Sequence, residues 1–167
     1  RQPWTEQPGG SGWETGSAKP GDRTFVFSNP TGASTLRFSP SPEATNFPLT
    51  DWVGYNTTIR QFDPRGPVDA YLTHPFDMYD YVSDLKLNLF YQRKSGAGPL
   101  RLSLSKNDDT FIAEILPDKV RLIRRRGDGS QTELGQTAWT APHRPAHIEF
   151  TNVDYRVALR IDDEDLI

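Results

Sequence analysis

The second half of the chain alternates apolar and polar residues one by one, and no other feature limits its possible folds as strongly. Five runs place every second, apolar side chain on one face: residues 84–91, 100–105, 110–116, 146–152 and 156–161. A sixth run, 119–125, is weaker because Ile123 breaks the pattern. Such alternation is typical of strands that bury one face of a sheet. The pattern therefore predicts half-buried β-strands along most of this half.

Short segments rich in Gly, Pro, Asn and Asp join the runs. They are residues 95–98, 106–109, 116–118, 127–130, 152–154 and 162–165. Strands joined at this spacing by turn-forming residues favour antiparallel meanders. Two such sheets must cover each other's apolar faces, since a sheet with one apolar side is not stable alone. We therefore predict an all-β, antiparallel β-sandwich, jelly-roll-like, with little or no helix.

Residues 1–83 differ from the second half in composition. Most of the 14 Pro and 13 Gly residues fall here, among many aromatic residues. Pro and Gly residues at this frequency prevent long helices. Short β-runs remain at 24–27, 35–38 and 52–56, which we expect to be edge or capping strands. The predicted organisation is one β-sandwich domain over residues 1–167, with an irregular part at 1–83 and regular strands at 84–167.

Composition excludes several classes of protein. The 167 residues contain no Cys, which rules out disulfides, thiolate zinc sites and cysteine nucleophiles. A net charge of −3 gives no electrostatic reason to expect a nucleic-acid partner. No run of about 18 apolar residues exists, so we expect this segment not to be inserted in a membrane. Arg1 is not an initiator residue and Leu166-Ile167 resembles the start of a strand, so we expect a segment of a longer protein.

Two patterns with catalytic or metal-binding letters have simpler explanations. Ser83 and Lys86 match a Ser-x-x-Lys nucleophile and base, but an odd spacing on an extended run sends them to opposite faces. His143 and His147 would chelate zinc only on a helix, whereas Pro145 lies between them and a strand follows. We expect surface or hydrogen-bonded histidines, and neither a metal site nor a cofactor.

Charged turns leave two alternatives open. Asp108-Asp109 and the acidic run 162–165 have carboxylates that suit calcium, but acidic hairpin turns are also common without a metal. Arg126-Gly127-Asp128 spells an integrin-type recognition motif, but Gly-Asp-Gly is also what a hairpin turn needs. The turn interpretation is favoured in both cases.

A small set of polar and aromatic residues forms the candidate binding site. The set is Asp51, Trp52, Tyr55, Asn56, Trp139, Asn152 and Asp154. The tryptophans are either stacking platforms for sugar rings or packing residues of a sandwich. The Asp and Asn side chains either form a polar binding rim or hold turns through hydrogen bonds to nearby backbone amides.

Several motifs together resemble a known insertion. They are Trp4 with Gly12-Trp13, then residues 35–38, 49–57 with its Thr-Asp-x-x-x-Tyr-Asn-Thr phrase, 82–87, 111–115 and 147–156 with its Asn-Val-Asp turn. In this order they resemble a large insertion found in signal peptidase I proteins of planctomycete bacteria. The second half is also similar to concanavalin A-like and laminin G-like sandwiches.

The resemblance implies a parent protein rather than an activity of this chain. In that family the peptidase is anchored in the membrane, acts on its extracytoplasmic (periplasmic) side, and cleaves signal peptides with a serine nucleophile and a lysine base. The nucleophile lies in a Ser-Met motif, whereas the only Met here, Met78, follows Asp77. No catalytic residue is therefore carried over. The implied role is a non-catalytic accessory or recognition domain, whose partners are the rest of the peptidase and its substrate preproteins.

Two other functions compete with this one. The first is a carbohydrate-binding β-sandwich module that binds a glycan, suggested by the tryptophans. The second is a jelly-roll hydrolase, which is disfavoured because no Glu-x-Asp-x-x-Glu pattern occurs. No pair of Asp or Glu residues in the sequence indicates the carboxylate separation of roughly 5 to 9 Å that glycosidases need.

Overall fold

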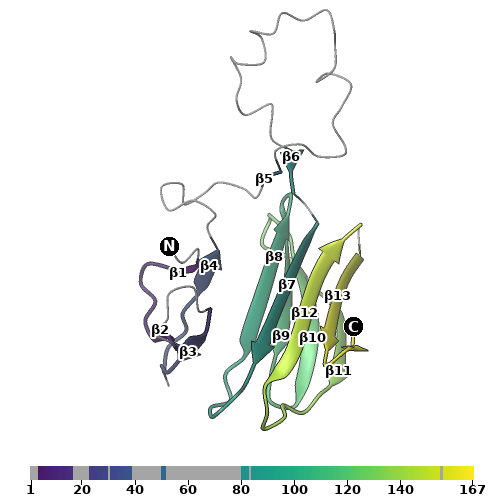
Figure 1. Ribbon diagram of the computed structural model, residues 1–167. Helices are drawn as coiled ribbons and strands as arrows, with labels where there is room; N and C mark the ends of the chain where they lie inside the picture. Colours follow the sequence, from purple (N-terminus) through teal and green to yellow (C-terminus); the bar gives the residue numbers. More distant parts are fainter. Residues whose placement is uncertain are drawn as a thin grey trace, which may run out of the picture. The chain divides into compact units, whose positions relative to one another are not determined.

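The computed structural model describes residues 4–16, 23–29, 31–38, 50–51, 80–82, 84–154 and 156–167, and of residues 50–51 and 80–81 the backbone alone. The described residues form strands and turns, and none of them is helical. The chain divides into two compact units, Arg1–Tyr81 and Val82–Ile167 (Figure 1). The boundary lies close to residue 83, where the sequence changes from Pro- and Gly-rich to regularly alternating. A single domain over 1–167 stays a prediction.

The described strands of the first unit are short and pair two by two. β1 (Trp4–Glu6) pairs with β4 (Leu36–Phe38), β2 (Trp13–Thr15) with β3 (Phe25–Phe27), and β5 (Thr50–Asp51) with β6 (Asp80–Tyr81), all antiparallel. The strands predicted at 24–27 and 35–38 are confirmed as β3 and β4. β1 and β2 were not predicted, because three residues are too few to show a period. The run predicted at 52–56 lies outside the described residues.

Aromatic pairs hold the first two of these strand pairs together. Trp4 lies directly across from Phe38, with ring centroids 5.3 Å apart in an edge-to-face arrangement. Trp13 lies across from Phe27 at 5.1 Å. Cross-strand aromatic pairs of this kind stabilise small sheets. Both tryptophan rings therefore take part in strand pairing.

The second unit contains two four-stranded antiparallel sheets. Its strands are β7 (Leu85–Tyr91), β8 (Leu100–Lys106), β9 (Asp109–Ile115), β10 (Lys119–Arg125), β11 (Gln131–Ala138), β12 (Ala146–Val153), β13 (Arg156–Ile161) and β14 (Glu164–Asp165). One sheet has the order β11-β10-β9-β8 and the other β14-β13-β12-β7. All six predicted runs are strands. β11 was not predicted, because this edge strand carries polar residues on both faces.

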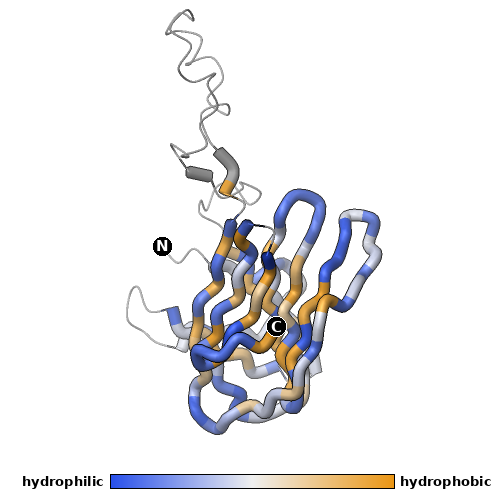
Figure 2. Tube along the Cα trace, turned by 90° about the vertical axis from the view of Figure 1, so that its right-hand side faces the viewer, coloured by the Kyte–Doolittle hydropathy of each residue, from blue (hydrophilic) through white to orange (hydrophobic). Residues whose placement is uncertain are grey.

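A shared apolar interior joins the two sheets into a sandwich. The buried apolar side chains form one cluster: Leu102, Leu104, Ala113, Ile115, Val120, Leu122, Ala146, Ile148, Phe150, Leu159 and Ile161. They come from both sheets, and Figure 2 shows apolar and polar residues alternating along the strands that supply them. Burying one large side chain of this kind contributes about 1.5–3 kcal/mol. The predicted all-β antiparallel sandwich is therefore what the structure shows.

The order of the strands is simpler than a jelly roll requires. β8 to β11 follow one another across their sheet, and β12 to β14 do the same in the other, where β7 lies beside β12. The jelly-roll part of the prediction is not confirmed by this order. The break at Ile123 corresponds to a shift in the pairing of β10 with β11 between Leu122 and Ile123.

Three of the hairpin turns contain Asn or Asp residues with a left-handed backbone. Asn107 (φ 54°) lies between β8 and β9, Asp154 (φ 46°) between β12 and β13, and Asp162 and Asp163 (φ 50° and 68°) between β13 and β14. Asn and Asp adopt this conformation more readily than other residues with a side chain. These turns set the register that directs every second side chain outward.

Candidate binding face

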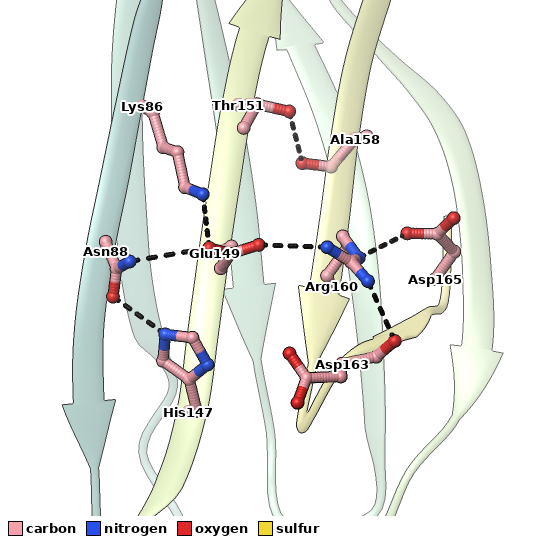
Figure 3. A network of polar contacts seen from close by, with 9 residues as sticks. All are labelled: Lys86, Asn88, His147, Glu149, Thr151, Ala158, Arg160, Asp163 and Asp165. Carbon is pink, nitrogen blue, oxygen red and sulfur yellow. Dashed lines mark hydrogen bonds and ion pairs between the residues drawn. The ribbon is translucent and has the colours of Figure 1, made fainter.

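The outer surface of the β14-β13-β12-β7 sheet carries a connected network of polar side chains (Figure 3). We call this surface the outer face of the β12 sheet. It contains rows of residues that lie directly opposite one another on neighbouring strands. One row runs Asn88, Glu149, Arg160, Asp165 across all four strands (Figure 3). Directly opposed side chains on one face lie about 4.5–5.5 Å apart at Cβ, so the members of a row interact.

Glu149 is the centre of this row. Its carboxylate forms an ion pair with Lys86, accepts a hydrogen bond from Arg160 Nη1 at 3.2 Å and one from Asn88 Nδ2 at 3.4 Å. Arg160 in turn forms an ion pair with Asp165, Nε to Oδ1 at 2.7 Å. The hydrogen bond from Lys86 and the attraction of nearby cations outweigh desolvation and lower the pKa of Glu149. The carboxylate therefore stays ionised, which suits a hydrogen-bond acceptor rather than a general acid.

A stacked pair of rings stands beside this row. Phe90 and His147 lie opposite each other on β7 and β12, with ring centroids 5.0 Å apart and planes at 29°. Phe90 is 73% exposed, the most exposed large apolar residue among those described. A large apolar side chain that is held in place and open to solvent is typical of contact surfaces. The ring pair is therefore the strongest candidate contact point on this face.

The contact with Asn88 selects the tautomer of the neutral His147 ring. His147 Nε2 lies 2.8 Å from Asn88 Oδ1, while the amide nitrogen of Asn88 donates to Glu149. An amide oxygen only accepts hydrogen bonds, so Nε2 must carry the hydrogen. In the neutral ring Nδ1 is then an acceptor. Asn88 thus couples the charged row to the ring pair.

The turn between β13 and β14 closes one end of the face. Asp162 accepts hydrogen bonds from the His147 backbone N–H at 2.9 Å and from Arg144 Nη2 at 2.7 Å. The Arg144 contact, followed by the His147 bond, lowers the pKa of Asp162. Asp162, which belongs to the acidic run 162–165, therefore has the partners that the turn interpretation expects. Within the described ranges, no group of three or more His, Asp or Glu side chains is arranged to hold a metal ion.

The opposite outer face, that of the β11-β10-β9-β8 sheet, is built around Glu114. Arg101 on β8 and Arg121 on β10 lie directly opposite it on either side, and both donate to its carboxylate, Arg101 Nε at 2.8 Å. Glu114 is only 1% exposed. Burial alone would raise its pKa, but the hydrogen bonds from Arg121 and Arg101 outweigh it, and the pKa is lowered. This row is closed, with its acceptor covered by its own partners.

Of the residues predicted as a binding site, the structure describes Trp139, Asn152 and Asp154, and the backbone of Asp51. Asp51 lies on β5, where its backbone pairs with Asp80, and Trp52, Tyr55 and Asn56 lie outside the described residues. Trp139 is partly buried and packs against the apolar cluster of the sandwich. Its environment is that of a packing residue rather than an open platform.

The two predicted polar residues near the end of β12 have separate roles. Asn152 lies in the strand and points inward, 1% exposed, and its amide nitrogen has no hydrogen-bond partner among the described residues. It therefore does not belong to an exposed rim. Asp154 is exposed and adopts the left-handed turn conformation.

The other charged turn also has internal partners. Arg126, Gly127 and Asp128 lie in the β10–β11 hairpin turn, where Asp128 Oδ1 accepts a hydrogen bond from the Ser130 N–H at 2.8 Å. Gly129, which follows, has a left-handed φ of 85°. This is the geometry that the turn interpretation predicts.

Sequence reasoning missed Asn88, Phe90, His147 and Glu149 as a group. One signal was present: Phe90 occupies the polar register of its strand, in line with Lys86 and Asn88. A large apolar residue in the outward set of an alternating strand indicates either a contact surface or an error in register. The pairing with β12 was needed to decide between them.

Comparison of the chain with protein-family models, with curated proteins and with solved structures finds no match in any of the three. The part of the chain that the structure describes contains no helix long and apolar enough to cross a membrane.

Proposed function

We propose that this chain is a non-catalytic recognition domain that contacts its ligand through the outer face of the β12 sheet. The exposure of Phe90, held against His147 beside a row of paired charges, carries this proposal. The pKa values of Glu149 and Glu114 are both lowered by cationic neighbours. A general acid works best with a pKa near the working pH, so these carboxyls are suited to positioning and not to proton transfer.

The parent that we propose is a signal peptidase I-like membrane serine endopeptidase, with this chain as an accessory domain on the extracytoplasmic side. The ordered motifs that resemble the planctomycete insertion support this. The open reading frame around this segment tests it directly. We expect an apolar membrane span and separate serine and lysine motifs in the flanking sequence; a flanking sequence without them would contradict the proposed parent.

The function itself is tested with the isolated chain and a synthetic signal peptide. We expect no cleavage of the peptide, and saturable binding that is lost in Phe90→Ser. Leu134→Ser is the matched control, because Leu134 is also an exposed apolar residue, 46% exposed, but lies on the other sheet. Cleavage by the chain alone would contradict the non-catalytic assignment.

A carbohydrate-binding module remains the second candidate, and one observation favours it. Phe90 presents an aromatic ring stacked on His147, and Asn88 and Lys86 lie on the same face of β7, supplying hydrogen-bond donors and an acceptor of the kind that sugar hydroxyls use. A glycan array probed with the chain and with Phe90→Ser distinguishes this candidate. Binding to a glycan that Phe90→Ser abolishes, together with no binding of the signal peptide, would favour it over the first. Binding that survives Phe90→Ser and fails in Trp139→Ala would move the site away from this face.

A further inference from the structure

Among the described residues, β7 is an edge strand of its sheet, and hydrogen bonds elsewhere in the sheet show which of its backbone groups point away from β12. The N–H of His147 donates to Asp162 Oδ1 and its C=O accepts from the Asp162 N–H, both at 2.9 Å, so the His147 backbone faces β13. In an antiparallel sheet, successive residues direct their backbone groups to opposite sides. The backbone N–H and C=O groups of Ile148 and Phe150 therefore face β7.

The same alternation continues into β7. Leu87 and Leu89 lie opposite Phe150 and Ile148, so their N–H and C=O groups are bonded to β12. Lys86, Asn88 and Phe90 then direct their N–H and C=O groups away from β12, toward the open edge. Among the described residues, β12 is the only strand that pairs with β7.

The two edges of this sheet differ in how they are protected. The opposite edge strand, β14, has two residues, both acidic and exposed, which is a usual protection against edge-to-edge pairing. β7 has seven residues in unbroken register, with no proline. Its one lysine, Lys86, forms an ion pair with Glu149 of its own sheet. Within its own seven residues, β7 therefore has no proline, no bulge and no lysine without an ion pair to protect the edge.

Apolar side chains at this edge are also incompletely covered. Phe90 is 73% exposed on the outer face. On the inner face, Leu85, Leu87 and Leu89 are only partly buried, whereas Ile148 and Phe150 on neighbouring β12 are fully buried. A further strand beside β7 would cover both sets.

We propose that two copies of this chain pair antiparallel through β7, forming one continuous sheet of eight strands. Edge-directed residues must oppose edge-directed residues, and the register that pairs all three places Asn88 opposite Asn88 of the second copy. Lys86 then opposes Phe90 of the second copy, twice by symmetry. Each copy contributes three N–H and three C=O groups, so about six hydrogen bonds form.

This register is complementary to itself, which is why a second copy is the occupant. Lys86 keeps its ion pair with Glu149, so the aliphatic part of its side chain lies beside the Phe90 ring of the second copy. On the inner side, Leu87 opposes Leu89 and Leu85 opposes Tyr91 of the second copy, pairing apolar with apolar. The charges of Lys86, Glu149, Arg160 and Asp165 balance within each copy, so the two outer faces meet without net repulsion.

Sedimentation equilibrium of the full chain tests the proposal without any ligand, so a failure to dimerise is distinguishable from a failure to bind a ligand, although both proposals use Phe90. We expect a monomer–dimer equilibrium that Phe90→Lys weakens by at least about tenfold, because Lys then faces Lys86 of the second copy. Leu134→Lys on the other sheet should leave it unchanged. Mixing Phe90→Lys with Lys86→Glu should restore pairing as a heterodimer. A chain that stays monomeric, or a dimer insensitive to Phe90→Lys, would overturn the proposal.

Amide exchange supplies a second readout that does not depend on any substitution. The N–H groups of Lys86, Asn88 and Phe90 should exchange slowly at concentrations where the dimer forms and rapidly in the dilute monomer. Protection of these three amides in a chain that remains monomeric would assign the edge to another segment of the same chain. That result would also overturn the proposal.

Discussion

The two sheets of the second unit each carry a central glutamate on the outer face, yet the two glutamates have different surroundings. Glu114 lies directly between Arg101 and Arg121, and its side chain is 2% exposed. Glu149 lies directly between Asn88 and Arg160, and its side chain is 12% exposed. One row reads Arg, Glu, Arg and the other Asn, Glu, Arg.

This single difference separates a closed row from an open one. Two arginines satisfy and cover the Glu114 carboxylate from both sides. Asn88 supplies only a long hydrogen bond to Glu149 and uses its oxygen to orient His147, against which Phe90 stacks. The comparison teaches that the amide at position 88 links a charged row to an exposed ring, which an arginine there would not do.

The largest effect on stability should come from a substitution in the apolar interior that the two sheets share. Phe150 is fully buried on β12, between the outward-facing Glu149 and Thr151. Phe150→Ala should lower the free energy of unfolding by about 3–5 kcal/mol, through lost burial and the cavity left behind. Denaturant unfolding measures this, with Val153→Ala, an exposed position on the same strand, as the control. A loss as small as that of the control would contradict the sandwich.

Removing the charge of each glutamate should separate the two rows next. Glu114→Gln leaves two guanidinium groups without their buried carboxylate and should cost about 1–3 kcal/mol. Glu149→Gln should cost less, because the Glu149 side chain is 12% exposed against 2% for Glu114, so water replaces more of the lost contact. Thermal or denaturant unfolding of both variants compares them. Equal losses would contradict the distinction between closed and open rows.

The pH dependence of stability follows from the same carboxylates. The pKa values of Glu114, Glu149 and Asp162 are lowered in the folded chain, so their stabilisation is fully present above their ordinary pKa values. It is lost as the pH falls through the folded pKa values, below about pH 5. We expect the free energy of unfolding to decrease over this range. Glu114→Gln should make the decrease shallower, and an unchanged slope would contradict its role.

Asn88→Arg should have the smallest effect on stability, but it tests most directly why the Glu149 row differs from the Glu114 row. This change converts the second row into Arg, Glu, Arg, and an exposed substitution of this kind alters stability by about 0.5 kcal/mol or less. It removes the acceptor of His147 Nε2. Nitrogen-15 spectra of the His147 ring should therefore change, while those of His143 should not. An unaltered His147 spectrum would show that Asn88 does not orient the ring.

The fold of the second unit was largely predictable from its sequence, and the proposed binding face was not. Alternation identifies strands because inward positions such as Ile148 and Phe150 must be apolar wherever a sheet covers a core. It failed for β11, an edge strand whose Gln131, Glu133 and Leu134 are all exposed. The rows depend on which strands are neighbours, and no single strand encodes that. Glu149 and Asn88 are 61 residues apart in the chain.

The most direct test of the proposed contact surface is chemical-shift mapping of the ¹⁵N-labelled chain during titration with a synthetic signal peptide. We expect the perturbed amides to cluster around Asn88, Phe90 and His147. Perturbations that cluster instead around Arg101, Glu114 and Arg121, or shifts that persist unchanged in Phe90→Ser, would contradict the assignment of the outer face of the β12 sheet.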